Sequence, residues 1–165
     1  MNSIVCIWNK ITAYSVSHSP VDPALGYRID YKGRSISISG DTIYDENLVN
    51  NSKNVDVLFH ESMSLDLVNL INKNAERIGN TMAAKVTIDI QDYHTPIPDI
   101  VRAAQEANVG HLVFYHHLPA PRNQLMENIM YRGVDEIMDN WTASHDGTMV
   151  ILPTDSDEII ITSVD

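Results

Sequence analysis

Side chains that can bind a metal ion follow directly after several predicted strands of this chain. They are His18, Asp41, the pair His60-Glu61 and the pair His116-His117. Neutral imidazole nitrogen and carboxylate oxygen are ligands that Zn²⁺ accepts, and a carboxylate can bridge two ions because it has two oxygens. The ends of strands on one edge of a layered α/β sheet converge on a shared crevice. The residue types therefore indicate a metal site at such an edge.

The spacing of these residues excludes a compact, finger-type zinc site. Whole predicted strands and helices separate His18, Asp41 and His116, whereas finger-type ligands come in pairs a few residues apart. A lone histidine beside a strand is usually a hydrogen-bonded structural residue, and an aspartate after a glycine is an ordinary turn residue. For His60 a hydrogen-bonding role at the strand end is favoured over a role as a direct ligand. His117 is a candidate for lining the pocket or supporting a ligand.

Alternating apolar and polar residues, together with short apolar runs, predict the strands that must position these side chains. The predicted strands are 11–17, 26–31, 34–39, 55–59, 112–115, 148–152 and 158–162. Lys32-Gly33 is the expected turn of a hairpin between the second and third of them. The runs 55–59 and 112–115 are mostly apolar, as in strands that are covered on both faces.

Apolar residues at helical spacing predict helices between the strands. The predicted helices are 65–78, 95–108 and 124–138. Thr95 is the expected N-cap of the second helix, with Pro96 at its first position. Strands joined by helices imply an α/β or α+β layered fold with helices packed on a sheet.

Length and composition describe one globular domain over residues 1–165. Hydrophobic residues make up 44 % of the chain and charged residues 20 %, which argues against a disordered protein. The net charge of −11 repels phosphate backbones, so nucleic acid is disfavoured as a partner. No stretch is long and apolar enough for a membrane span and no export signal precedes the first strand, so we expect a cytoplasmic protein without a membrane partner. The single cysteine, Cys6, excludes an internal disulfide framework.

Five ordered motifs together resemble one known family. In chain order they are Ser-Val-Ser-His18-Ser-Pro, Ser39-Gly-Asp41-Thr, Leu58-Phe-His60-Glu61, Tyr93-His94-Thr-Pro and Leu112-Val-Phe-Tyr-His116. They resemble the second half of metallo-β-lactamase-fold hydrolases, in the branch that contains ribonuclease Z and arylsulfatase-like enzymes. Each motif alone is weak, but five in the same order across nearly the whole chain are specific.

The resemblance implies roles for individual residues. His18 resembles a histidine of the first metal site, Asp41 the carboxylate that bridges two ions, and His116 the last histidine of the second site. His94 resembles the histidine beside the scissile phosphate, which stabilises charge or passes a proton, and Glu61 resembles its acidic partner. The implied cofactor is a pair of zinc ions that lower the pKa of a bridging water, so that hydroxide attacks an ester or phosphodiester.

The chain departs from the family pattern in one respect. Most metal ligands of this family come from an earlier His-x-His-x-Asp-His segment, and this sequence has none. His18 with Asp41, and Asp41 with His116, would give each ion two protein ligands, whereas catalytic zinc usually has three. The family fold is an αββα sandwich, of which the chain matches one half. We therefore expect a mixed sheet with helices on one face and an exposed apolar surface on the other.

Two functions stay open at this point. The first is the C-terminal half of a metal-dependent hydrolase acting on a small ester or phosphodiester, incomplete and inactive without a missing N-terminal half. The second is a non-catalytic remnant that serves as a binding or dimerisation module, for example as a homodimer through its exposed sheet face. Two tightly held zinc ions per chain would contradict the incomplete site, and no bound zinc would favour the module.

Overall fold

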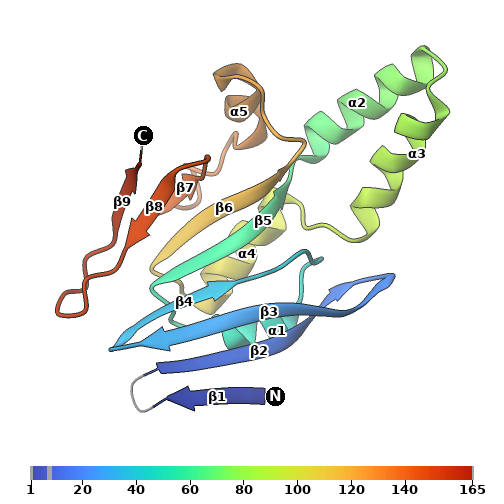
Figure 1. Ribbon diagram of the computed structural model, residues 1–165. Helices are drawn as coiled ribbons and strands as arrows, with labels where there is room; N and C mark the ends of the chain where they lie inside the picture. The colour runs from blue at the N-terminus through green and yellow to red at the C-terminus, as the bar shows by residue number, and fades with distance from the viewer. Residues whose placement is uncertain (1, 7–8, 165) are drawn as a thin grey trace.

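A seven-stranded mixed sheet forms the centre of the fold (Figure 1). The computed structural model describes residues 2–6 and 9–164, and the strands follow one another across the sheet in chain order. The strands are β1 (Asn2–Cys6), β2 (Asn9–His18), β3 (Val21–Tyr31), β4 (Arg34–Ile38), β5 (Val57–Met63), β6 (His111–Leu118) and β7 (Trp141–Ala143). The pairs from β1 to β4 are antiparallel and the pairs from β4 to β7 are parallel. The expected mixed sheet is confirmed.

The predicted hairpin between β3 and β4 is present, with its turn at the expected place. Lys32 and Gly33 both have positive φ, at 48° and 82°, as a tight hairpin turn requires. Across this turn Tyr31 pairs with Arg34 and Ile29 with Ile36. The hairpin register therefore places the alternate apolar residues of both strands on the same face of the sheet.

Helices cover one face of the sheet. The helical elements are α1 (Glu46–Asn51), α2 (Leu65–Arg77), α3 (Thr81–Asp89), the 3₁₀ turn η1 (Ile90–Asp92), α4 (Ile97–Ala107) and α5 (Gln124–Met130). In Figure 1, α1 and α4 lie behind the sheet, while α2 and α3 form a hairpin beyond its end. Ile100 of α4 packs in one core cluster with Leu58 of β5 and Phe114 of β6. No helix within the described residues is long and apolar enough to cross a membrane.

Two of the predicted helices differ from those observed. The helix predicted from residue 95 begins at Ile97 with Pro96 as its N-cap, and the Thr95 hydroxyl instead donates to the carbonyl of Thr42 at 2.5 Å. The predicted capping role of Thr95 was therefore wrong, because a tertiary contact takes its hydroxyl. The helix predicted over 124–138 ends at Met130, and Gly133 beyond it has φ 84°, which an α-helix does not contain.

The last two strands form a separate two-stranded sheet, as predicted. Strands β8 (Thr148–Ile151) and β9 (Ile160–Ser163) pair antiparallel. Arg34 of the central sheet is buried and donates to the carbonyls of Pro153 and Glu158, each at 3.1 Å. Its guanidinium also pairs with Asp56 at 2.8 Å. This arginine therefore joins the β8–β9 connection to the central sheet.

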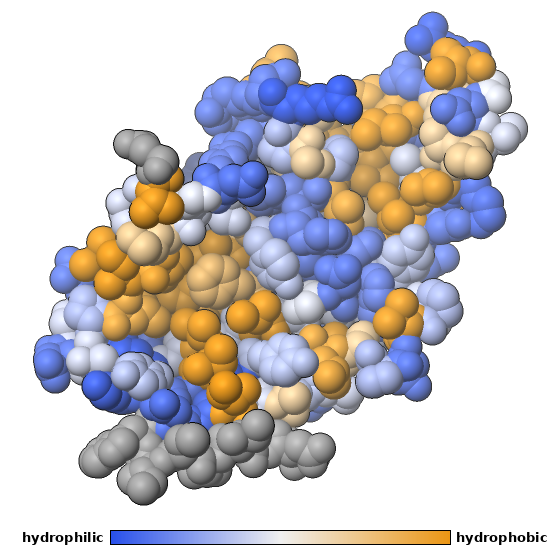
Figure 2. Space-filling view, viewed as in Figure 1, coloured by the Kyte–Doolittle hydropathy of each residue, from blue (hydrophilic) through white to orange (hydrophobic). Residues whose placement is uncertain are grey.

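The sheet face opposite α1 is apolar, and it is exposed at its β2–β3 end, whereas Val57 and Val113 at its other end are fully buried. Two rows of side chains cross it, and they are Ile11, Ile29, Ile36 and Val57, then Ala13, Tyr27, Ile38, Phe59 and Val113. At the β2 end of the rows the side chains are exposed, with Ile11 at 43 % and Tyr27 at 41 %. Figure 2, viewed as in Figure 1, shows hydrophobic side chains gathered over this part of the molecule. The expected exposed apolar face is confirmed at the β2–β3 end of the sheet only.

Candidate metal centre

The sheet brings the five predicted site residues to one edge. His18 ends β2, Asp41 follows β4, and Glu61 and His116 lie toward the ends of β5 and β6. His94 reaches the same place from the segment between η1 and α4. Because β4, β5 and β6 are parallel, their carboxyl ends share this edge.

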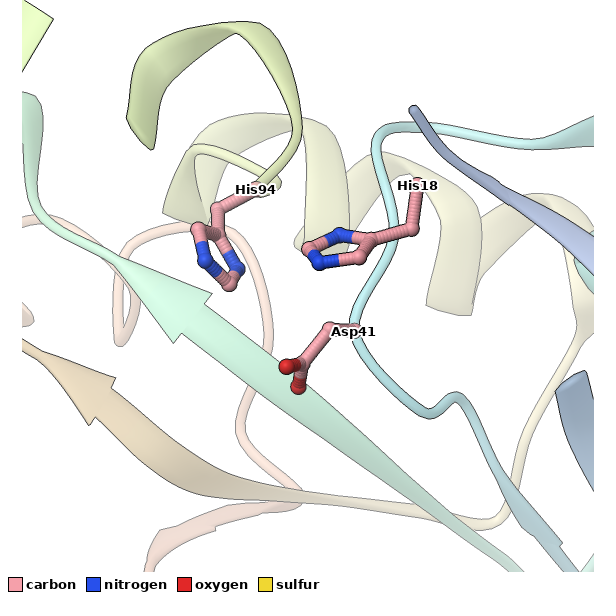
Figure 3. A group of neighbouring side chains, drawn as sticks. All are labelled: His18, Asp41 and His94. Atoms are coloured by element: carbon pink, nitrogen blue, oxygen red, sulfur yellow. The ribbon is translucent and has the colours of Figure 1, made fainter. Parts of the chain in front are cut away.

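His18, Asp41 and His94 form the first group of potential ligands. One nitrogen of each ring and one oxygen of Asp41 all lie within 4.8 Å of one another. Figure 3 shows both rings and the carboxylate pointing into the space between them. The Nδ1 of His18 lies 2.7 Å from the carbonyl of Tyr93, so Nδ1 carries the proton and Nε2 keeps its lone pair. A histidine held in this way is typical of a metal ligand.

Glu61, His94 and His116 form the second group. Their ligand atoms also lie within 4.8 Å of one another, so His94 belongs to both groups. The Nδ1 of His94 donates to Oε1 of Glu61 at 3.2 Å, and the backbone N–H of Thr95 donates to the same oxygen at 2.9 Å. Glu61 is fully buried, and its Oε2 accepts no hydrogen bond from the residues that the structure describes. A buried carboxylate oxygen of this kind needs a cation or a proton as its partner.

Asp41 stands between the two groups. Its Oδ1 lies 3.4 Å from Nδ1 of His116, and its carboxylate also belongs to the group with His18. The side chains of Asp41 and His116 are 41 % and 43 % exposed, so the site opens to solvent. Asp41 therefore lies within reach of His18 and His94 on one side and of His116 on the other.

His116 occupies a strained backbone position. Its φ is 45°, in the left-handed region, which costs a residue with a Cβ roughly 1–2 kcal/mol. Tyr115 pairs with Glu61 and His117 pairs with Ser62, so His116 is the extra residue of a β-bulge. Bulges and left-handed residues of this kind occur next to active sites, where they redirect a side chain.

Two histidines next to the site residues, His60 and His117, have supporting roles. His60 is buried and its Nδ1 donates to the carbonyl of Glu61 at 2.7 Å, as the sequence favoured. Burial in the apolar core lowers the pKa of His60, so the ring is neutral at neutral pH. His117 lines a cavity of about 620 Å³ beside His116, together with Tyr115, Ser144 and His145. Its predicted pocket-lining position is confirmed.

Some features of the site had no signal in the sequence. The Tyr93 carbonyl fixes the ring of His18, and His94 belongs to both ligand groups. Both features depend on how η1 and the residues after it lie over the strand ends. The resemblance gave His94 a role in stabilising charge or passing a proton, and the Tyr93-His94 motif contained nothing to indicate a place in both groups.

Comparison with known proteins agrees with this geometry. No protein-family model matches the chain. The ribonuclease Z of Mycobacterium tuberculosis is 32 % identical over 103 residues, and that of Mycobacterium avium is 30 % identical over 118 residues. Those matches cover 62 % and 69 % of this chain. The metallo-β-lactamase fold protein YhfI from Bacillus subtilis superimposes over 85 % of the chain with a TM-score of 0.57 and 17 % identity.

The chain belongs to the metallo-β-lactamase superfamily, on its ribonuclease Z branch. It spans 34 % and 38 % of the lengths of the two mycobacterial relatives and 48 % of YhfI. The described residues therefore correspond to about one half of a metallo-β-lactamase fold. The donors present, imidazole nitrogen and carboxylate oxygen, are those that Zn²⁺ binds, and the buried Oε2 of Glu61 is consistent with a cation nearby.

Proposed function

We propose that this chain is the C-terminal half of a metal-dependent hydrolase that cleaves an ester or phosphodiester bond. The observation that carries the proposal is the pair of ligand groups that meet at Asp41 and His94. An ordinary structural histidine needs no carboxylate and no second histidine within reach. Here three histidines and two carboxylates point into one solvent-open site.

Two zinc ions are the proposed cofactor. His18 and Asp41 would hold one ion, and Asp41 and His116 would hold the other. When bound, such ions lower the pKa of a water and stabilise negative charge on the reacting group. With His94 assigned to proton transfer and Glu61 to holding its ring, each ion would have two ligands from these residues, and catalytic zinc usually has three. We therefore assign the remaining ligands of each ion to the missing N-terminal half. We expect the chain alone to be inactive.

His94 is the proposed catalytic residue that acts on protons. Its Nδ1 is bonded to Glu61, so its Nε2 is the ring atom available to the site. In that position it can stabilise charge on the scissile group or pass a proton to the leaving oxygen. Glu61 fixes the ring orientation, because its Oε1 is itself held by the backbone N–H of Thr95.

A phosphodiester is the favoured substrate class. The two mycobacterial relatives are named as ribonucleases, which weighs against the sequence-based expectation that nucleic acid is disfavoured. The net charge of −11 still argues against a long nucleic acid bound by this half alone. A small phosphodiester satisfies both observations.

The non-catalytic alternative is favoured by one observation, which is the open apolar face of the sheet. Exposed patches of this kind mark association surfaces. Under this alternative the chain would pair with itself or with another protein through Ile11 and Tyr27, and the histidines would be a remnant of an ancestral site.

Zinc titration with the purified chain separates the two functions. We expect zinc to bind, Asp41→Asn and His116→Ala each to weaken the binding at least roughly tenfold, and His111→Ala to leave it unchanged. His111 is a suitable control because it lies on the same strand and is bonded to Thr142, outside both ligand groups. No zinc binding, or binding that Asp41→Asn leaves intact, would contradict the hydrolase.

Turnover of bis(p-nitrophenyl) phosphate tests the incomplete site. We expect negligible zinc-dependent turnover from the chain alone. Turnover that disappears in His116→Ala would show that these residues suffice for catalysis and that no further ligands are needed.

A further inference from the structure

We propose that His117 is a positioning residue that holds His116 in the orientation needed for metal binding. This inference rests on the proposed function and adds to it a residue that the family motifs do not assign. His117 follows the bulged residue directly, and its side chain is bonded to three separate segments of the chain.

Both ring nitrogens of His117 have partners. Its Nε2 lies 2.7 Å from the carbonyl of Ser144, and because a carbonyl only accepts, Nε2 carries the proton. Its Nδ1 therefore has a free lone pair, which accepts from the hydroxyl of Tyr131 at 2.6 Å and lies 3.0 Å from Oγ of Ser62. The neutral ring with its proton on Nε2 satisfies the bonds to Ser144 and Tyr131, so a single tautomer is fixed.

The partners of His117 are themselves fixed. Tyr131 is buried and its ring packs against Phe114 with 4.9 Å between centroids. The backbone N–H of Ser144 donates to the carbonyl of Phe114 at 2.9 Å. Ser62 is fully buried in β5 and pairs with His117 across the sheet. The His117 ring is therefore anchored to the core through rigid neighbours.

This anchoring determines where His116 points. With Tyr115 paired to Glu61 and His117 paired to Ser62, no position in the ladder remains for His116, which bulges out toward Asp41. Without the anchor, the strand could shift by one residue and place His116 opposite Ser62. Such a shift sends a side chain to the other face of the sheet. The shift would also allow His116 to leave its left-handed backbone conformation. Because that conformation costs free energy, leaving it would favour the shift.

The test compares four variants of the full chain. His117→Leu removes both hydrogen-bonding atoms, and His117→Gln keeps an N–H donor for the Ser144 carbonyl. Tyr131→Phe removes one hydroxyl while keeping the buried ring. His111→Leu is the matched control, since it alters another histidine of β6 that is bonded to a neighbouring strand. Thermal unfolding of each variant, followed by circular dichroism, shows which of them are folded.

Cobalt titration gives the first readout, because the visible bands of Co²⁺ report its coordination geometry. We expect His117→Leu to weaken cobalt binding roughly 10- to 100-fold and to alter the visible spectrum, as loss of a residue that orients a ligand does. We expect Tyr131→Phe to give a smaller loss, His117→Gln to restore most of the affinity, and His111→Leu to have no effect. An equal loss in His111→Leu, or none in His117→Leu, would overturn the proposal. If His117→Leu does not fold, Tyr131→Phe decides, and unchanged cobalt binding in it would overturn the proposal.

The backbone of His116 in the metal-free protein gives the second readout. Backbone chemical shifts should show a left-handed residue at position 116 in the parent chain and its loss in His117→Leu. If the parent chain binds no cobalt, the proposed hydrolase fails, while this measurement still decides the role of His117. A left-handed His116 that persists in both His117→Leu and Tyr131→Phe would overturn that role.

Discussion

Gly40 controls the position of Asp41, and replacing it with alanine is the sharpest perturbation of the site. Gly40 has φ 65°, and a Cβ added there would lie 2.5 Å from the carbonyl oxygen of Leu25. The left-handed conformation costs a Cβ-bearing residue roughly 1–2 kcal/mol. Relieving an overpacked contact with backbone costs about 1–3 kcal/mol more. We expect Gly40→Ala to lower the free energy of unfolding by about 2–5 kcal/mol in total.

Gly33→Ala is the matched control for this substitution. Gly33 has φ 82°, and a Cβ added there would have nothing within 4 Å, so only the backbone cost applies. Urea unfolding should show a loss of roughly 1–2 kcal/mol for Gly33→Ala and a clearly larger loss for Gly40→Ala. Zinc titration should show weaker binding in Gly40→Ala alone, because the displaced turn carries Asp41. Equal stability losses and equal zinc affinities in the two variants would refute the reasoning.

Two further predictions concern pH and association. Because burial lowers the pKa of His60 below the unfolded value, the unfolded chain binds more protons as the pH falls below about 6.5. Stability should therefore be full above that pH and decrease below it, by up to about 1.4 kcal/mol per pH unit for one histidine. Urea unfolding at a series of pH values should show a shallower decrease in His60→Leu than in His145→Leu, and identical slopes would contradict the burial argument. Tyr27→Ser should reduce self-association measured by analytical ultracentrifugation, because Tyr27 lies in an exposed apolar row, whereas Ile78→Ser, exposed outside the rows, should not. Equal effects of the two substitutions would exclude the open face as the association surface.

The sheet was largely predictable because its strands follow simple local rules. β2, β3 and β4 alternate apolar and polar residues since one face meets α1 and the other is open, and the Lys32-Gly33 turn fixes their register. Strands β5 and β6 are longer than their apolar runs, because each extends into the polar residues of the site. Local composition predicts the buried run, and only the paired neighbour determines where the strand stops.

The helices were less predictable where they are short or poorly buried. α1 spans six residues, and α3 buries only Thr87 among its residues, so neither presents a periodic apolar face to the sequence pattern. The early end of α5 follows from the positive φ of Gly133, which sequence periodicity does not register.

The motifs predicted which side chains meet at this edge of the sheet, but not how they are oriented and held there. Each strand-end motif carries its own histidine or carboxylate, so His18, Asp41 and His116 could be named from the sequence. The bulge at His116 and the bonds of His117 join residues of β5 and β6, the residue that follows α5 and the segment after β7. Such contacts exist only once the whole sheet has formed.

Crystals soaked in zinc chloride test the gathering of His18, Asp41 and His116 most directly, through an anomalous difference map at the zinc absorption edge. The account predicts a peak roughly 2.0–2.2 Å from a carboxylate oxygen of Asp41 and from a ring nitrogen of His18 or His116. A well-ordered site without a peak, or zinc bound in it without contact to Asp41, would contradict the account.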